Sequence, residues 1–92
     1  MPDALTNTDQ IGQVTVGTSA VQLPSTNDEV GVTIKALAAN TGKIYIGTSN
    51  AVTTATGFEL TAGQQINSQL VNANTLYAIS DTAAQKICYI AN

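Results

Sequence analysis

The side chains that enzymes most often use for proton transfer, nucleophilic attack and metal binding are scarce in this sequence. The 92 residues include no histidine and one cysteine, Cys88. Without histidine, the Ser-His and Cys-His pairs that activate a nucleophile are missing, and so are the Cys and His sets that bind zinc. We therefore expect a protein that is not an enzyme and that has no catalytic, metal-binding or cofactor-binding residues.

Two sets of residues with reactive or ligating side chains remain, and each has a simpler interpretation. Asp28 and Glu29, joined by Asp81 or Asn27, offer oxygen atoms of the kind that bind calcium, but loop carboxylates of this sort are usually solvated. Cys88 lies in the apolar run KICYIA, where a free thiol most often acts as a small buried hydrophobic group. We assign neither set a role.

Charge is low throughout the chain and negative on balance. Only 10% of the residues are charged, so threonine, serine, asparagine and glutamine must cover most of the surface. The net charge of −3 disfavours binding to nucleic acid or to an anionic membrane, because both require clustered positive charge. No apolar run approaches the roughly 18 residues of a membrane-spanning helix, and the N-terminus lacks a signal-peptide pattern. We expect synthesis in the cytoplasm, and partners other than nucleic acid and membrane.

Apolar and polar residues alternate along most of the chain, which predicts short β-strands. The residues expected to face inward are Val14, Val16, Val21, Leu23, Val30, Val32, Ile34, Ala36, Ile44, Ile46, Phe58, Leu60, Ile66 and Leu70. Lys43, Tyr45 and Glu59 are expected to face outward. An outward Tyr45 ring could stack on a sugar, although a tyrosine in a strand more often packs against its cross-strand neighbours.

This pattern predicts an all-β chain with about eight strands, at the spacing of a sandwich or barrel. We expect a single small antiparallel β-sandwich of jelly-roll-like type, with minimal helix, over residues 11–92. An immunoglobulin-like strand order is the alternative, since periodicity predicts strands but not their connections. The segment DTAAQK could form one helical turn. Residues 1–10 lack periodicity and are expected to form a flexible N-terminal arm.

The last two predicted strands carry apolar side chains on both faces. In QKICYIA, for example, Ile87 and Tyr89 share one face and Cys88 and Ile90 share the other. A strand of this kind lies either between two layers of one domain or against another copy of the chain. We favour a subunit or capsid interface on this C-terminal surface, formed by Tyr77, Ile79, Ile87 and Tyr89.

A run of small hydroxylated residues, GTSNAVTTATG, connects two of the central strands. Its hydroxyl groups from Thr48 to Thr56 can bond to nearby backbone groups and order a protruding loop. We add Thr53 and Thr54 to the expected contact residues on this ground. A solvated loop without a partner is the alternative.

Three segments carry a resemblance to a known group of proteins. They are VTVGTSAVQLP, GVTIKALAANTGKIYIGTSNAVTTATGFELTAGQ and LYAISDTAAQKICYIA, and together they span residues 13–91. The set resembles small virion accessory proteins of tailed bacteriophages, of the capsid decoration or cement type. None of its motifs is catalytic.

The resemblance implies a β-sandwich that is built into the virion. It would bind the outer surface of the phage head as a homotrimer, seated between subunits of the major capsid protein. A receptor- or glycan-binding module of a phage fibre, neck or tail is the second interpretation. An intracellular host-takeover protein is the third.

Overall fold

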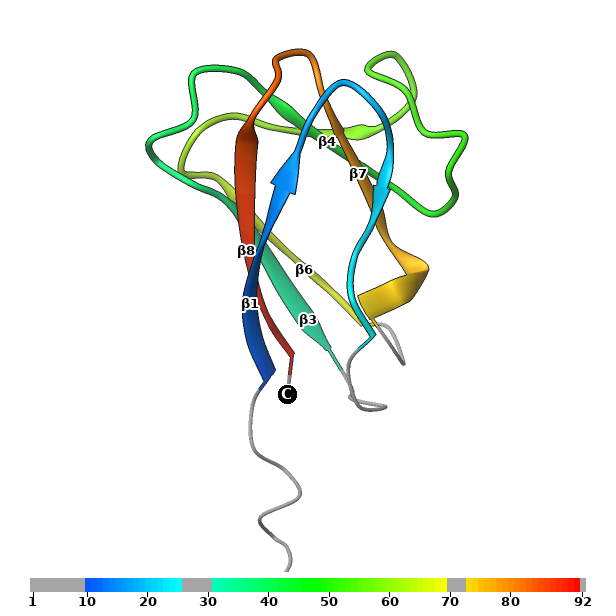
Figure 1. Cartoon of the computed structure of the whole chain (residues 1–92). Coiled ribbons are helices and arrows are strands. Elements are labelled where there is room, and N and C mark those ends of the chain that lie inside the picture. The colour runs from blue at the N-terminus through cyan, green and yellow to red at the C-terminus, as the bar shows by residue number, and fades with distance from the viewer. Residues whose placement is uncertain (1–9, 26–30, 70–72, 92) are drawn as a thin grey trace, which may run out of the picture.

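The regular structure of this protein is almost entirely β-sheet (Figure 1). The computed structural model describes residues 10–25, 31–69 and 73–91. The strands within these residues are β1 (Gln10–Val16), β2 (Val21–Gln22), β3 (Val32–Ala36), β4 (Ile44–Gly47), β5 (Phe58–Leu60), β6 (Gln65–Ser68), β7 (Tyr77–Ser80) and β8 (Gln85–Ala91). One turn of 3-10 helix, η1, spans Ala73–Thr75. No described helix has the length and apolar character needed to cross a membrane.

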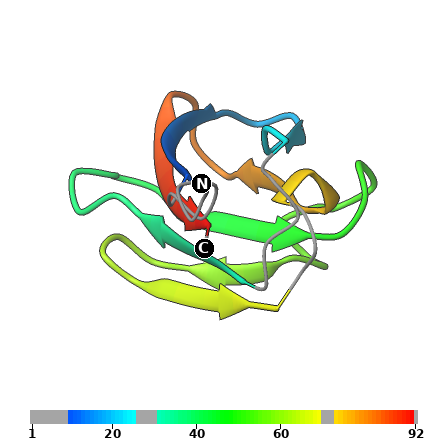
Figure 2. The same cartoon turned by 90° about the horizontal axis from the view of Figure 1, so that it is seen from below.

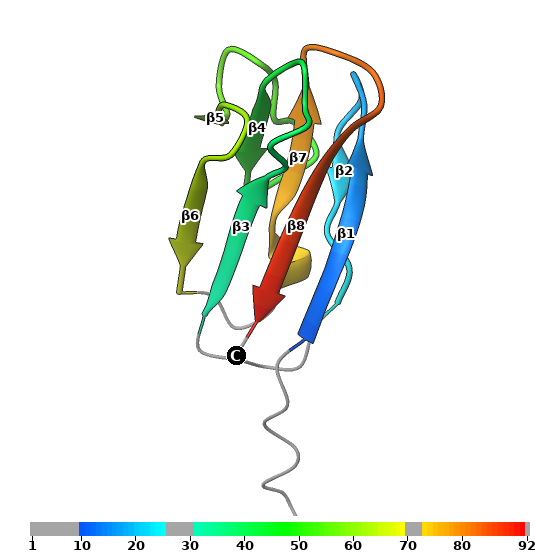
Figure 3. The same cartoon turned by 90° about the vertical axis from the view of Figure 1, so that its left-hand side faces the viewer.

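The first four strands pair antiparallel with the last four, in the manner of a long hairpin that is folded over into two sheets. β1 pairs with β8, β2 with β7, β3 with β6 and β4 with β5, so each strand of the first half has a partner in the second half. Two further pairings, β3 with β8 and β4 with β7, complete two four-stranded sheets. We call β1-β8-β3-β6 the front sheet and β2-β7-β4-β5 the back sheet, as they appear in Figure 3.

This strand order is that of a jelly roll, which confirms the predicted fold class and decides against the immunoglobulin-like alternative. Seen from below, the strands surround a common core (Figure 2). Directly opposite residues of antiparallel strands point to the same face, and this register brings the inward residues of both sheets together. The largest fully buried side chains are Leu23, Ile34, Ile44, Leu60, Ile87, Val16 and Ser80.

Most residues that alternation predicts to face inward do so. Val32, Ile34, Ala36, Ile44, Ile46 and Leu60 are buried core residues, as are Val16 and Leu23, and Val14, Val21 and Ile66 are partly buried against them. Val30 and Leu70 lie outside the described residues. So does the predicted arm, apart from Gln10, which begins β1.

Two local predictions are wrong. Phe58 lies opposite Ile46 in the register, on the inward side, yet it is 60% exposed while Ile46 is 6% exposed. β5 is the end strand of the back sheet, which leaves this position open at the edge of the sandwich, although Leu60 of the same strand is covered. The segment DTAAQK forms a turn followed by the start of β8 rather than a helical turn.

Candidate functional site

The described carboxylates do not gather into a chemical centre. Within residues 10–25, 31–69 and 73–91, no group of three or more His, Cys, Asp or Glu side chains is placed to hold a metal ion. Glu59 Oε2 lies 3.3 Å from Lys43 Nζ. Asp81 Oδ1 accepts hydrogen bonds from the Lys43 backbone N–H and the Thr82 hydroxyl, each at 3.0 Å. The other residues suggested for calcium, Asn27 to Glu29, lie outside the described part of the chain.

These contacts shift the pKa of two surface groups. The hydrogen bond to Glu59, followed by the charge of that carboxylate, raises the pKa of Lys43. The Lys43 backbone N–H, followed by the Thr82 hydroxyl, lowers the pKa of Asp81 because both donors favour the charged carboxylate. Both groups are exposed at the surface, so the shifts describe a solvated cluster that joins the start of β4 to the end of β7.

Asp81 should make a pH-dependent contribution to stability. Because its folded-state pKa is lowered, the charged carboxylate stabilises the fold above the ordinary aspartate pKa of about 3.9. That contribution is lost as the pH falls through the folded-state pKa. We expect Asp81→Asn to lower the melting temperature slightly at neutral pH and to leave it unchanged at strongly acidic pH. Thermal unfolding of both proteins across this pH range measures the gap, and a gap that stays constant at acidic pH contradicts the assignment.

The loop between β4 and β5 is held by the hydroxyl groups that the sequence places there. The Thr53 N–H donates to Thr56 Oγ1 at 3.0 Å, the Ala55 N–H donates to Thr53 Oγ1 at 3.2 Å and the Ala51 N–H donates to Ser49 Oγ at 3.2 Å. The two threonine oxygens lie 3.1 Å apart and share a further hydrogen bond. The prediction that hydroxyl groups order this loop is therefore confirmed.

The same loop covers the outer face of β4. A Cβ atom added at Gly47 would lie 2.5 Å from Val52 Cβ, and one added at Gly57 would lie 2.6 Å from Tyr45 Cβ, so both positions require glycine. Val52 is 7% exposed and Tyr45 is 8% exposed as a result. Tyr45 lies on the outward side, as alternation predicts, but it is not available as a platform for a ligand. The loop shields it.

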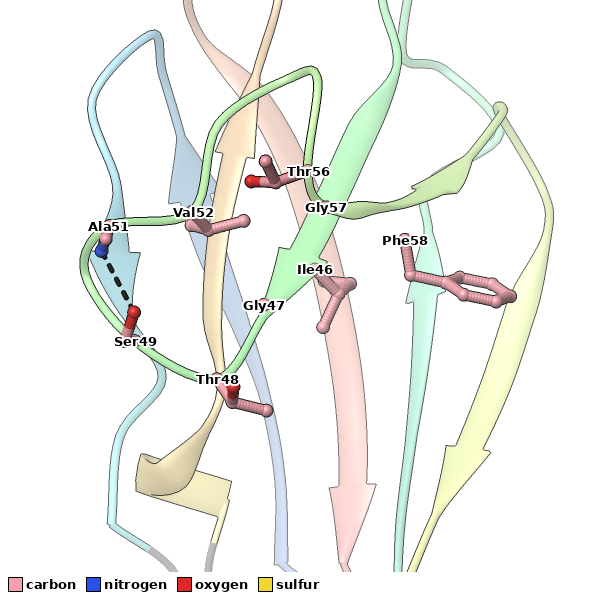
Figure 4. Close-up of a pocket in the computed structure, with 9 residues that line it drawn as sticks. All are labelled: Ile46, Gly47, Thr48, Ser49, Ala51, Val52, Thr56, Gly57 and Phe58. Carbon is pink, nitrogen blue, oxygen red and sulfur yellow. Dashed lines mark hydrogen bonds between the residues drawn. The ribbon is translucent and has the colours of Figure 1, made fainter.

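A hollow of about 610 Å³ opens beside this loop (Figure 4). Thr48, Ser49 and Thr56 line it with hydroxyl groups, and Phe58 lines its other side. The Phe58 ring points away from Val52 (Figure 4). A second hollow of about 300 Å³, which Phe58 and Glu59 line, lies between β5 and β6. Phe58 therefore separates two shallow depressions at this edge of the sandwich.

Four of the six predicted interface residues lie where they can reach a partner. Tyr77 and Ile79 are half-buried on the outer face of the back sheet, where they lie opposite Gly47 and Tyr45 of β4. Thr53 and Thr54 are exposed in the adjoining loop. These residues and the loop form one continuous surface, although the sequence separates them by more than 20 positions.

The other two predicted interface residues lie on the core side of the front sheet. The assignment of Ile87 is wrong, whereas Tyr89 also lines a hollow on the outer side of this sheet and its assignment stays a prediction. Ile87 is fully buried. Tyr89 is half-buried against the core, and its ring lies over Gly12, where an added Cβ would be 2.6 Å from the tyrosine oxygen. β8 is a central strand of its sheet, but only its inward face packs against the second sheet, so the apolar residues of its outward face remain at the surface.

The outward side of β8 carries the apolar residues that a partner can reach. Cys88 and Ile90 are half-buried there and form a shallow hollow of about 210 Å³ with Ile11 and Lys35. The expectation that the Cys88 thiol is buried is therefore wrong. Cys88 and Ile87 are neighbours in β8, so their side chains point to opposite faces of the sheet, and only Ile87 faces the core. The Cys88 sulfur lies 3.7 Å from the Lys35 carbonyl oxygen, to which it can donate.

Two large hydrophobic residues are exposed that the sequence did not predict to be so. Ile11, at 72% exposure, and Phe58, at 60%, are the large hydrophobic residues that the described surface leaves most open to solvent. The sequence contains a signal for Ile11, because alternation with Val14 and Val16 places it on the outer face beside Gln13 and Thr15. Phe58 gives no such signal, since its exposure follows from the position of β5 in the sheet order.

Comparison of the chain with protein-family models, curated proteins and solved structures produced no match.

Proposed function

We propose that this protein is a structural virion component, a capsid decoration or cement protein that binds the outer surface of a tailed-bacteriophage head and stabilises it. It acts as a homotrimer whose second partner is the major capsid protein. Its place is the capsid surface, after synthesis in the host cytoplasm. The observation that carries this proposal is the exposure of Ile11 (72%) and Phe58 (60%) on a chain with only 10% charged residues.

Several physical properties suit such a role. Interfaces are depleted of lysine, glutamate and aspartate relative to the rest of a protein surface, and this chain has few of them. A shell offers many identical sites, so modest contacts gain affinity through multivalency. Association would also add stability to a domain whose small size limits its core. The motifs in residues 13–91 that resemble phage virion accessory proteins support the same proposal.

Light scattering and a head-binding assay test the proposal together. The purified chain should have the mass of a trimer, and its addition to heads of the encoding phage that were assembled without it should raise their melting temperature. An unrelated β-sandwich protein of similar size serves as the control. A strictly monomeric chain that does not sediment with the heads would argue strongly against this function.

A receptor- or glycan-binding module of a fibre, neck or tail is the second candidate. The observation that favours it is the exposed Phe58 ring beside a hollow with hydroxyl-bearing walls. Tyr45, whose ring the sequence suggests as a surface for stacking on a sugar, is shielded by the loop. Binding to a glycan array that is lost in Phe58→Ala but kept in Ile11→Ala would favour this candidate over decoration.

A further inference from the structure

We infer that copies of this chain associate head to tail, so that the surface around Ile11 of one copy packs against the surface around Phe58 of the next. We call these the Ile11 surface (Ile11, Lys35, Cys88 and Ile90) and the Phe58 surface (Phe58, Glu59 and the two hollows beside them). The inference rests on the proposed homo-oligomer and names the contact that would build it.

The two exposed hydrophobic residues lie far apart on the sandwich. β1 and β5 are both end strands, and the two sheets stack with β1 beside β2 at one edge of the sandwich and β6 beside β5 at the other (Figure 3). Ile11 and Phe58 therefore lie at opposite edges. A contact with two-fold symmetry uses the same surface on both copies, so it would cover either Ile11 or Phe58. A head-to-tail contact covers both residues.

The shapes of the two surfaces also suit such a contact. Each exposed residue stands beside a depression that a neighbouring side chain can enter. Ile11 borders the hollow of about 210 Å³ with Cys88 and Ile90. Phe58 borders the hollows of about 610 Å³ and about 300 Å³. Ile11 and Phe58 can thus each act as a projection that fills a depression on the other copy.

The charges of the two surfaces also differ. Lys35 lines the hollow at Ile11, and Lys86 is exposed on the same outer face of the front sheet. The described strands of that sheet contain no carboxylate. Glu59 lines the hollow at Phe58. Two Ile11 surfaces placed together would bring lysines together, which is unfavourable. At the Phe58 surface the negative charge of Glu59 is balanced by Lys43, whose Nζ lies 3.3 Å away, so an Ile11 surface can meet it without that repulsion.

Head-to-tail contacts close into a ring when the rotation between copies allows it. The proposed homotrimer is such a ring, with each copy using one Ile11 surface and one Phe58 surface. A chain that lacks one of the two surfaces can still use the other, and this property provides a direct test.

The test uses the full chain with Ile11→Asp or Phe58→Asp, measured by analytical ultracentrifugation above the concentration at which the wild type assembles. Each variant alone should be monomeric. An equal mixture should give a 1:1 dimer, because the Ile11 surface of Phe58→Asp can bind the Phe58 surface of Ile11→Asp. Circular dichroism checks folding, and Ile11→Ser and Phe58→Ser replace any variant that fails to fold. Ser19→Asp, which adds a charge at an exposed position outside both surfaces, is the matched control and should assemble like the wild type.

Three results would overturn the inference. They are a monomeric wild type, a single variant that still assembles alone, and a mixture that stays monomeric. A variant that forms dimers by itself would instead indicate a two-fold contact through its intact surface. Failure of the proposed function is distinguishable from these outcomes. If the mixture forms the expected dimer but the wild type does not bind heads, the head-to-tail contact stands and the decoration role falls.

Discussion

Ile87→Ala is expected to lower the free energy of unfolding by about 2–5 kcal/mol, the usual cost of truncating a fully buried isoleucine. Ile87 is completely buried, and it lies between Val14 of β1 and Ala36 of β3 in the front sheet. A loss of this size corresponds to a fall in melting temperature of roughly 10–30 °C for a domain of this length. Chemical denaturation with urea, monitored by circular dichroism, measures it.

Ile90→Ala is the matched control for this prediction. Ile90 is the same residue type in the same strand, but it lies half-buried on the outer face. Its truncation should cost less than half as much, since much of its surface is already in water. Equal losses of unfolding free energy at the two positions, or a larger loss at Ile90, would contradict the placement of Ile87 in the core. Such a result would support the prediction that Ile87 belongs to an interface.

Gln85→Leu is expected to cost about 2–4 kcal/mol, because it leaves two backbone donors without an acceptor. Gln85 is 5% exposed at the start of β8. Its Oε1 accepts the N–H groups of Thr41 and Gly42 at 2.7 and 2.9 Å. Its Nε2 donates to the carbonyl oxygen of Ala83 at 3.0 Å. Leucine has a similar volume and can make none of these bonds.

Hydrogen exchange of the Thr41 and Gly42 amides reports on this contact directly. Both amides should exchange markedly faster in Gln85→Leu, together with the loss of stability in urea. Gln13→Leu, an exposed position in the neighbouring strand β1, provides the control and should change stability by no more than about 0.5 kcal/mol. Unchanged protection of the two amides would show that the loop holds without the Gln85 side chain.

The predicted architecture follows from local patterns that have a direct physical basis. Alternation in VGVTIKAL assigns Val32, Ile34 and Ala36 to the core because a strand turns successive side chains to opposite faces. The hydroxyl groups of the β4–β5 loop also act locally, since Thr53 and Thr56 bond to atoms within three residues of themselves. Such short-range effects can be predicted from sequence.

The errors arise where burial depends on strand order. Phe58 and Leu60 have the same alternation in the end strand β5, yet Leu60 is 2% exposed and Phe58 is 60% exposed. Ile87 and Cys88 are both apolar, and their sequence does not reveal which of them faces the second sheet. Tyr45 lies against Gly57, a residue of the loop that follows its own strand. Each outcome depends on contacts between segments that periodicity does not connect.

For the predicted interface residues, too, some features can be predicted from local sequence and others depend on strand order. The apolar character of Tyr77 and Ile79 is visible in the sequence, and their position on one face follows from their spacing. Their proximity to the β4–β5 loop follows from the pairing of β7 with β4. The opposite placement of Ile11 and Phe58 follows from the order of both sheets. Strand connections, which periodicity does not encode, thus determine which apolar residues remain open to a partner.

Electron microscopy of phage heads to which the purified chain has been added tests the proposed role most directly. We expect three-dimensional maps to show jelly-roll bodies in trimeric rings on the outer surface of the shell, with neighbouring bodies joined edge to edge through Ile11 and Phe58. Bare heads at saturating protein, or added density confined to the neck or tail, would contradict the proposal.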